Sequence, residues 1–254
     1  MGNIIIKTTQ EIELIRESCR IVADVLRLLK TAIRPGVTTK ELDTLAEEYI
    51  HSQQAKPAFK GYGFEKHNLF PASICASVDD VVVHGIPGNH RLREGEVISI
   101  DVGALKNGYY GDGAWTFEVG KVSEDKLRLM RVTEESLYKG IEQAKPGNRV
   151  KDISAAIQQH VEGAGFSVVR DLVGHGVGRQ LHEEPAIPNY VDSNSSPKLK
   201  SGMTLAIEPM VNYGTFRVRV SDDGWTVRTE DGMPSAHFEH TVLVTDNGPE
   251  ILTR

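Results

Sequence analysis

The sequence predicts an α/β (α+β) fold in which strands from two related halves of the chain form a sheet that helices cover. The first observation behind this prediction is a duplication. RPGVTTKELDTLAEEYI at 34–50 resembles KPGNRVKDISAAIQQHV at 145–161, at an offset of 111 residues. A repeat period of about 20–50 residues would indicate a solenoid, whereas one duplication of half the chain indicates a pseudo-symmetric domain. We therefore expect a single domain over residues 1–254, with halves at about 9–120 and 121–250.

The second observation is that three short, strand-like segments also recur. The pairs are VVVHGIP (81–87) with LVGHGVG (172–178), EGEVISID (94–101) with SGMTLAIE (201–208), and DGAWTFEV (112–119) with EHTVLVTD (239–246). The copies agree best at residues of the type that bind metal ions. These residues are His84, Asp101, Asp112, His175, Glu208 and Glu239.

Helical periodicity precedes each Pro-Gly break and is the third observation. Thr8 and Glu11 form a capping box, which predicts a helix N-terminus. The apolar residues that follow are spaced by three and four, as on one helix face: Ile12, Ile15, Cys19, Val22, Leu26, Leu29 and Ile33. We expect this helix to end at Pro35-Gly36 and a second to begin at Thr38.

A hairpin is predicted where Asn107-Gly108 separates two strand-like runs. In that register Gly103 faces Asp112, so Asp101 lies diagonally from Asp112 on the same face. Diagonal neighbours are about 7–8 Å apart, which lets two carboxylates share a ligand between them. We expect room for that ligand beside the small residues Gly103, Ala104, Gly111 and Gly113.

Four carboxylates and one imidazole make an oxygen-rich set of candidate ligands. Converging carboxylates repel one another in a low-dielectric site, and bound cations remove that cost. The set suits Mn²⁺, Fe²⁺ or Co²⁺, and Zn²⁺ is also compatible. Because five side chains exceed the need of one small ion, we expect two divalent metal ions, about 3.5–4 Å apart.

Each candidate ligand also has a purely structural explanation. Asp112 could belong to a turn, Glu239 could be an exposed strand residue, and His175 between two glycines could serve the loop. Glu208 is harder to explain in this way, because apolar residues flank it and unpaired charges are rarely buried. The duplication aligns these residues jointly and therefore favours the metal site.

Composition restricts the class of protein. The 254 residues are 39% hydrophobic and 25% charged, as in an ordinary globular protein, and the net charge of −6 argues against broad nucleic-acid binding. Two cysteines, Cys19 and Cys75, are too few for a disulfide framework and suit a reducing compartment. No apolar run approaches the roughly 20 residues that span a bilayer. We expect a cytoplasmic protein that does not associate with membranes.

Three other motifs have weaker support in the sequence. GHGVG at 174–178 resembles a phosphate-binding loop, but Arg179 replaces the third glycine and a poor helix start follows. HEEP at 182–185 lacks the second histidine of a zincin helix, because position 186 is alanine. Cys75 has no neighbouring base motif, and a buried apolar role is favoured over a nucleophilic one.

The ordered motifs resemble the methionine aminopeptidases, in particular the short bacterial-type class I enzymes. The similarity covers nearly the whole chain, and its motifs are VVHGIP, IDVGALKNGYYGD, GHGVGRQLHEEP, MTLAIEPMV and FEHTVLVTDNG. The resemblance implies the "pita-bread" fold, a pseudo-two-fold, curved and mainly antiparallel sheet covered by two pairs of helices. That fold agrees with the duplication in the sequence.

The resemblance also implies roles for individual residues. The ligands of two divalent metal ions (Co²⁺, Mn²⁺, Fe²⁺ or Zn²⁺) would be Asp101, Asp112, His175, Glu208 and Glu239, with Asp112 and Glu239 bridging. A metal-bridged hydroxide would attack the first peptide carbonyl, and a metal-bound α-amine would restrict cleavage to the first residue. His182 would hydrogen-bond the carbonyl region, His84 would contact the scissile amide, and Glu208 would transfer the proton.

The pocket for the substrate side chain departs from the family pattern. Phe70, Cys75 and Trp225 match positions that line it, but the stretch around Tyr62 to His67 is longer than in the family. Leu181 stands where a phenylalanine is common, and we expect His67 to lie at the surface. These departures concern side-chain selectivity and leave the metal ligands unaffected.

The function implied is removal of the initiator methionine from nascent proteins, with preference for a small second residue. The expected partner is the N-terminal peptide of these chains, including at the ribosome, and the expected state is a monomer. One alternative is a prolidase-like enzyme of the same fold, which would cleave next to proline. Another is a non-catalytic relative that binds peptides, but such proteins typically lose ligands and all five are present here.

Overall fold

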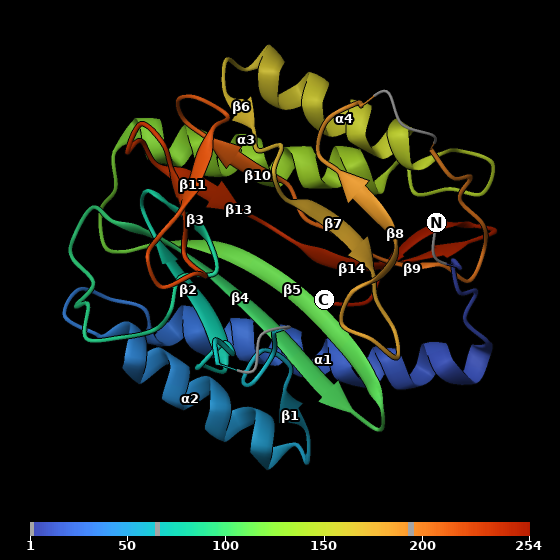
Figure 1. Ribbon diagram of the computed structural model, residues 1–254, viewed down its shortest axis with the longest axis horizontal. Helices are drawn as coiled ribbons and strands as arrows, with labels where there is room; N and C mark the ends of the chain where they lie inside the picture. Colours follow the sequence, from blue (N-terminus) through green and yellow to red (C-terminus); the bar gives the residue numbers. More distant parts are fainter. Residues whose placement is uncertain (1–2, 64–66, 193–195) are drawn as a thin grey trace.

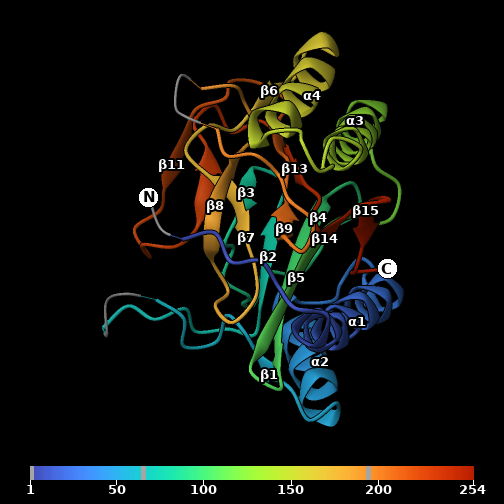
Figure 2. The same ribbon diagram turned by 90° about the vertical axis from the view of Figure 1, so that its right-hand side faces the viewer.

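Two antiparallel helix pairs frame the strands in the computed structural model, which describes residues 3–63, 67–192 and 196–254. The helices are α1 (Thr9–Ala32), α2 (Thr39–Ser52), α3 (Glu124–Ile141) and α4 (Val150–Gly163). Helix α4 begins and ends 111 residues after α2, at the offset of the sequence repeat. Figure 1 shows α1 and α2 along one edge of the molecule and α3 and α4 along the other. In Figure 2 both pairs lie toward one side, and β8 and β11 lie toward the other.

The strands between the helix pairs come from both halves of the chain. Those before α3 are β1 (Lys56–Pro57), β2 (Ile74–Val78), β3 (Val81–Val83), β4 (Val97–Lys106) and β5 (Tyr109–Glu118). Those after α4 are β6 (Ser167–Val168), β7 (Val173–Gly176), β8 (Glu183–Pro188), β9 (Thr204–Ile207), β10 (Met210–Asn212), β11 (Val218–Val220), β12 (Val227–Thr229), β13 (Ser235–His237), β14 (His240–Thr245) and β15 (Gly248–Ile251). Every pairing between these strands is antiparallel, and the predicted fold class is confirmed.

The predicted helix starts are confirmed by their capping contacts. The Thr8 hydroxyl accepts a hydrogen bond from the Glu11 backbone N–H, while the Glu11 carboxylate accepts one from Thr8 N–H. The same reciprocal pair joins Thr38 and Glu41 at the start of α2. Each pair satisfies backbone donors that a helix leaves free at its first turn. Among the described residues, no helix is both long and apolar enough to cross a membrane.

The β4–β5 hairpin has the predicted register. Gly103 pairs with Asp112, and Asp101 pairs with Ala114, which puts the two aspartates in the predicted diagonal relation. The turn residues Asn107 and Gly108 have φ values of 51° and 81°, and these residue types tolerate that left-handed conformation best. Local turn chemistry therefore sets the spacing of two candidate ligands.

A backbone connection joins the two halves next to the candidate site. Glu239 N–H donates to the Ala114 carbonyl over 2.8 Å, and Ala114 N–H donates back to the Glu239 carbonyl over 3.3 Å. The Thr241 hydroxyl bridges further, donating to the Asp112 carbonyl and accepting from the Asp112 N–H. These bonds hold the second arm of the first hairpin against β14 of the second half.

Each half has its own apolar core between helices and strands. The first contains Leu29, Leu42 and Ile100, and the second contains Leu129, Ile153 and Leu205, all fully buried. Trp115 packs against both cores, from the middle of β5. The strands that carry the candidate ligands are therefore supported from behind by close-packed side chains, which restricts their movement.

The expectation that small residues around the aspartates make room for a ligand was wrong for part of the set. A Cβ atom on Gly111 would lie 2.6 Å from the backbone nitrogen of Cys19, and one on Gly113 would lie 3.1 Å from Val22. Both glycines therefore face α1. Ala104 is fully buried in the first core, so of the four small residues only Gly103 faces Phe59 at the cavity.

Candidate metal centre and active site

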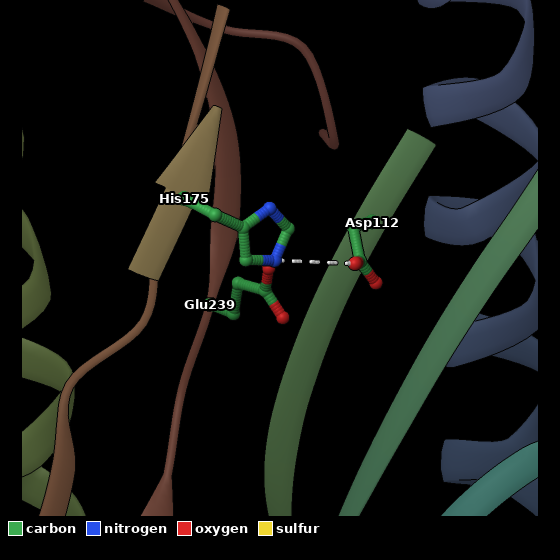
Figure 3. A group of neighbouring side chains, drawn as sticks. All are labelled: Asp112, His175 and Glu239. Atoms are coloured by element: carbon green, nitrogen blue, oxygen red, sulfur yellow. Dashed lines mark ion pairs between the residues drawn. The ribbon is translucent and has the colours of Figure 1, made fainter. Parts of the chain in front are cut away.

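The five candidate ligands come from five different segments and meet at the junction of the two halves. Asp101 lies on β4, Asp112 on β5 and His175 on β7, while Glu208 follows β9 and Glu239 precedes β14. The Nε2 atom of His175 lies 3.8 Å from Asp112 Oδ2 and 3.5 Å from Glu208 Oε1. Asp112, His175 and Glu239 each offer one potential ligand atom, and these three atoms lie within 4.8 Å of one another. Figure 3 shows the three side chains.

Burial makes the carboxylates unfavourable as bare anions. Asp112 and Glu239 are only 4% and 2% exposed, and burial followed by the neighbouring carboxylates raises both pKa values well above the ordinary range. Burial likewise raises the pKa of Asp101 to about 7 and that of Glu208 to about 8. Positive charge placed among them would stabilise the ionised forms and reverse these shifts.

Two of these carboxylates also have oxygens without protein partners. Asp101 Oδ1 and Glu239 Oε1 are buried and find no hydrogen-bond donor among the described residues. Unsatisfied polar atoms are rare in protein interiors, and each calls for a specific explanation. A divalent cation satisfies such oxygens directly, so the residues fit the predicted metal site.

The hydrogen bond of His175 prepares its other nitrogen as a ligand. Its Nδ1 lies 2.9 Å from the Gly176 carbonyl oxygen, which can only accept, so Nδ1 carries the proton. The unprotonated Nε2 then faces the carboxylates of Asp112 and Glu208. Burial, with a smaller effect of His182, lowers the pKa of His175 to about 3, which keeps the ring neutral as metal ligation requires.

The two histidines predicted to contact substrate border the same site. The His182 ring lies 4.3 Å from that of His175, between centroids, and burial lowers its pKa. His84 follows β3 with a φ of 57°, a left-handed conformation that is uncommon outside glycine and often marks functional sites. Burial, then His237 and His182, lower the pKa of His84 to about 4.

The five candidate ligands, His84 and His182 line one cavity of about 150 Å³. Its wall includes every predicted site residue: Phe70, Cys75, His84, Asp101, Asp112, His175, His182, Glu208, Trp225 and Glu239. Phe70 meets Trp225 edge-to-face at 5.3 Å between ring centroids. The metal-type ligands and an apolar, aromatic compartment are thus parts of the same space, although the individual roles stay predictions.

The structure also shows the conformation of the GHGVG and HEEP segments and the exposure of the two cysteines and His67. The strand β8 follows GHGVG, so neither a phosphate-binding loop nor a zincin helix is formed there. Cys19 and Cys75 are both free and buried, and Cys75 lines the cavity. His67 is exposed, as predicted, while residues 64–66 of the lengthened stretch lie outside the described part of the chain.

Sequence reasoning missed several residues of the site, and two of them, Tyr62 and His237, make polar contacts to its predicted members. Tyr62 lines the cavity, and its hydroxyl lies 2.6 Å from Nδ1 of His182. His237 is buried with its Nε2 3.5 Å from Glu208 Oε2. A signal for His237 was present, because residues two apart in extended chain share a face and His237 stands two before Glu239. Nothing local points from Tyr62 to His182, which is 120 residues away.

Comparison with known proteins agrees with this geometry. The model of metallopeptidase family M24 matches residues 13–246. The chain belongs to metallopeptidase family M24. It is 55% identical over 251 residues to "Methionine aminopeptidase 1" of Bacillus subtilis, with 99% of each protein covered. These findings confirm the predicted enzyme class, a metallo-aminopeptidase, and the resemblance stated from the motifs.

Two solved structures place the fold in a wider group. A methionine aminopeptidase from Thermotoga maritima superposes with a TM-score of 0.95 at 49% identity, covering 99% of this chain and 100% of that one. A prolidase from Pyrococcus furiosus superposes with a TM-score of 0.79 at 27% identity, and 65% of its chain is covered. The pita-bread arrangement is thus common to both, and similarity is higher to the first.

The metal-free protein is expected to lose stability as the pH rises toward about 8, because folded carboxyls hold protons there that the unfolded chain has released. Burial raises the pKa of Glu208 to about 8 in the fold, so its contribution to the unfolding free energy falls as the pH approaches that value and levels off above it. Mn²⁺ should weaken this dependence by stabilising the ionised forms. The measurement is the midpoint of thermal unfolding against pH, with chelator and with Mn²⁺. An equal pH dependence in both samples would contradict the prediction.

Proposed function

We propose that this protein removes the N-terminal methionine from nascent proteins, using two divalent metal ions held between its halves. The observation that carries the proposal is the single cavity in which buried, unpartnered carboxylate oxygens adjoin an aromatic compartment. The similarity to the methionine aminopeptidase of Bacillus subtilis, at 55% identity, supports the choice of methionine as the residue removed. The preference for a small second residue rests on the family resemblance.

The ligands of the metal pair would be the five residues gathered where the β4–β5 hairpin meets β7, β9 and β14, namely Asp101, Asp112, His175, Glu208 and Glu239. The protonated Nδ1 of His175 and the unpartnered oxygen of Glu239 support this assignment. When bound, the two cations supply Lewis acidity, which polarises the peptide carbonyl and lowers the pKa of the attacking water.

The other polar groups of the cavity act on the substrate in this account. His182 donates a hydrogen bond to the carbonyl oxygen of the first residue as negative charge develops there. His84 contacts the nitrogen of the scissile amide, and Glu208 accepts the proton of the attacking water and passes it to that leaving nitrogen. Glu208 lines the cavity together with both histidines, which places its carboxylate where it can meet the attacking water and the leaving nitrogen.

The compartment beside these groups selects the side chain. It is lined by apolar and aromatic side chains, namely Phe59, Tyr62, Phe70, Cys75, Leu181 and Trp225. A flexible, polarisable thioether packs well against aromatic edges and a thiol, whereas a charged side chain would be left without a partner. The walls therefore favour methionine over polar first residues.

We also propose that the protein acts in the cytoplasm, as a monomer, where it meets nascent chains at the ribosome. Its two buried, unpaired cysteines are consistent with a reducing compartment. These statements follow from the substrate proposed above.

The test compares the peptide Met-Ala-Ser with an Xaa-Pro peptide, each with added Mn²⁺ or Co²⁺, and measures the free amino acid released. We expect methionine from the first peptide and no cleavage beside proline. Failure to cleave Met-Ala-Ser with any divalent ion would refute the proposal. Preferential cleavage of Xaa-Pro would instead assign the prolidase-like activity of the more distant structural relatives.

A further inference from the structure

Tyr62 makes the shortest polar contact to either substrate-facing histidine. Its hydroxyl oxygen lies 2.6 Å from Nδ1 of His182, and the two ring centroids are 5.2 Å apart. Tyr62 belongs to the loop between β1 and β2, whereas His182 immediately precedes β8. The contact therefore joins the wall of the side-chain compartment to a group placed at the reacting bond.

The backbone on both sides of His182 is fixed independently. Leu181 is buried in the apolar cluster that also contains Phe70 and Cys75. The Glu183 carboxylate pairs with Lys7 over 2.6 Å, with both side chains almost fully buried, and accepts from the N–H of Gln180. With the main chain held on each side, the remaining freedom of His182 is the orientation and the tautomer of its ring.

The geometry indicates which partner donates in this hydrogen bond. Its 2.6 Å length is below the range of about 2.7–3.2 Å usual for N–H donors, while hydroxyl donors commonly make bonds this short. A hydroxyl can donate to Nδ1 only when that nitrogen carries no proton, so this contact describes a neutral imidazole. A neutral imidazole has one donor and one acceptor nitrogen, so a phenol that donates to Nδ1 leaves the proton on Nε2.

We propose that Tyr62 is a positioning residue that holds His182 in the Nε2–H tautomer, so that Nε2 donates to the carbonyl oxygen of the scissile bond. This inference rests on the proposed function for the role of His182. The alternative tautomer would present a lone pair to an oxygen that is gaining negative charge, and that contact would be repulsive.

The neighbouring His175 is held in the opposite tautomer to the one proposed for His182. Its Nδ1–H donates to the Gly176 carbonyl, which leaves Nε2 as an acceptor, and its ring lies 4.3 Å from that of His182. Two adjacent imidazoles are thus held in opposite tautomers by different partners. Nε2 of His175 offers a lone pair to a cation. The hydrogen bond from Tyr62 keeps a proton on Nε2 of His182, so that nitrogen has no lone pair with which to compete for the metal.

The direct test is NMR spectroscopy of Zn²⁺-loaded protein with ¹⁵N-labelled histidine, with the His182 signals assigned by comparison with His182→Gln. We expect a protonated Nε2 and an unprotonated Nδ1 for His182, and the reverse for His175. A protonated Nδ1 on His182 would overturn the proposal. This result does not depend on any activity, so it decides the role of Tyr62 even if Met-Ala-Ser is not a substrate.

The kinetic test replaces the phenol alone. Tyr62→Phe is expected to lower kcat for Met-Ala-Ser by about tenfold, the scale of one lost hydrogen bond, with a smaller change in KM. Its His182 should show mixed tautomers. The matched control is Tyr138→Phe, which removes the hydroxyl of a tyrosine on α3 that does not line the cavity and should leave both readouts unchanged.

Two outcomes separate the inference from the proposed function. If the unaltered protein cleaves Met-Ala-Ser and Tyr62→Phe keeps its kcat and its Nε2–H signal, the inference is wrong and the function stands. If the unaltered protein does not cleave the peptide, the proposed function fails and the tautomer measurement alone decides the part played by Tyr62.

Discussion

Replacing Asp112 with asparagine is expected to lower kcat/KM for Met-Ala-Ser by about a thousandfold, because metal ions contribute several kcal/mol of transition-state stabilisation and each 1.36 kcal/mol is about tenfold. The Oδ2 atom of Asp112 lies 3.8 Å from Nε2 of His175, and Figure 3 marks this ion pair with a dashed line. The measurement is steady-state hydrolysis with saturating Mn²⁺, together with calorimetric titration of Mn²⁺ into the variant.

The same substitution is not expected to lower the stability of the metal-free protein. Burial and then the neighbouring carboxylates raise the pKa of Asp112, so its ionised form is unfavourable without metal, and a neutral amide of the same shape avoids that cost. The unfolding temperature without metal should therefore be unchanged or higher, while the increase caused by Mn²⁺ shrinks. The control is Glu118→Gln, on the exposed end of the same strand. Full activity in Asp112→Asn would show that the metal assignment is wrong.

Replacing His182 with alanine is expected to lower kcat by about a hundredfold, the usual cost of losing one donor to a developing oxyanion. The effect on KM should be smaller, because the hydrogen bond strengthens only as charge forms on the carbonyl oxygen. The control is His160→Ala, which removes a histidine on α4 that does not line the cavity. Peptide hydrolysis over a range of substrate concentrations separates the two constants.

A fall in kcat of less than about threefold would contradict the role given to His182, since a hydrogen bond made in the transition state must contribute more than that. A rise in KM with an unchanged kcat would instead indicate uniform binding of substrate. Unaltered Mn²⁺ binding by the variant, measured by calorimetry, would confirm that the change acts on catalysis and not on the metal ligands.

Much of the candidate site was predictable from the sequence because its ligands stand at strand positions set by local rules. The turn at Asn107-Gly108 determines the hairpin register, and the register determines that Asp101 and Asp112 share a face. The duplication then identifies Glu208 and Glu239 as their counterparts. These inferences need only short-range chemistry and self-similarity, which a single sequence contains.

The features that escaped prediction depend on how distant segments dock. Gly111 is required because α1 passes over it, so its Cβ position falls on the Cys19 backbone and not on the metal site. The contact between Tyr62 and His182 crosses two loops of irregular conformation. Periodicity carries no information about such contacts, because the packing of complete elements determines them.

In the proposed mechanism, both halves of the chain together hold a pair of divalent cations. The most direct measurement is an anomalous difference map from crystals grown with Mn²⁺. We expect two peaks in this map, both enclosed by Asp101, Asp112, His175, Glu208 and Glu239. A map without peaks among these five side chains, or with peaks only elsewhere on the protein, would contradict it.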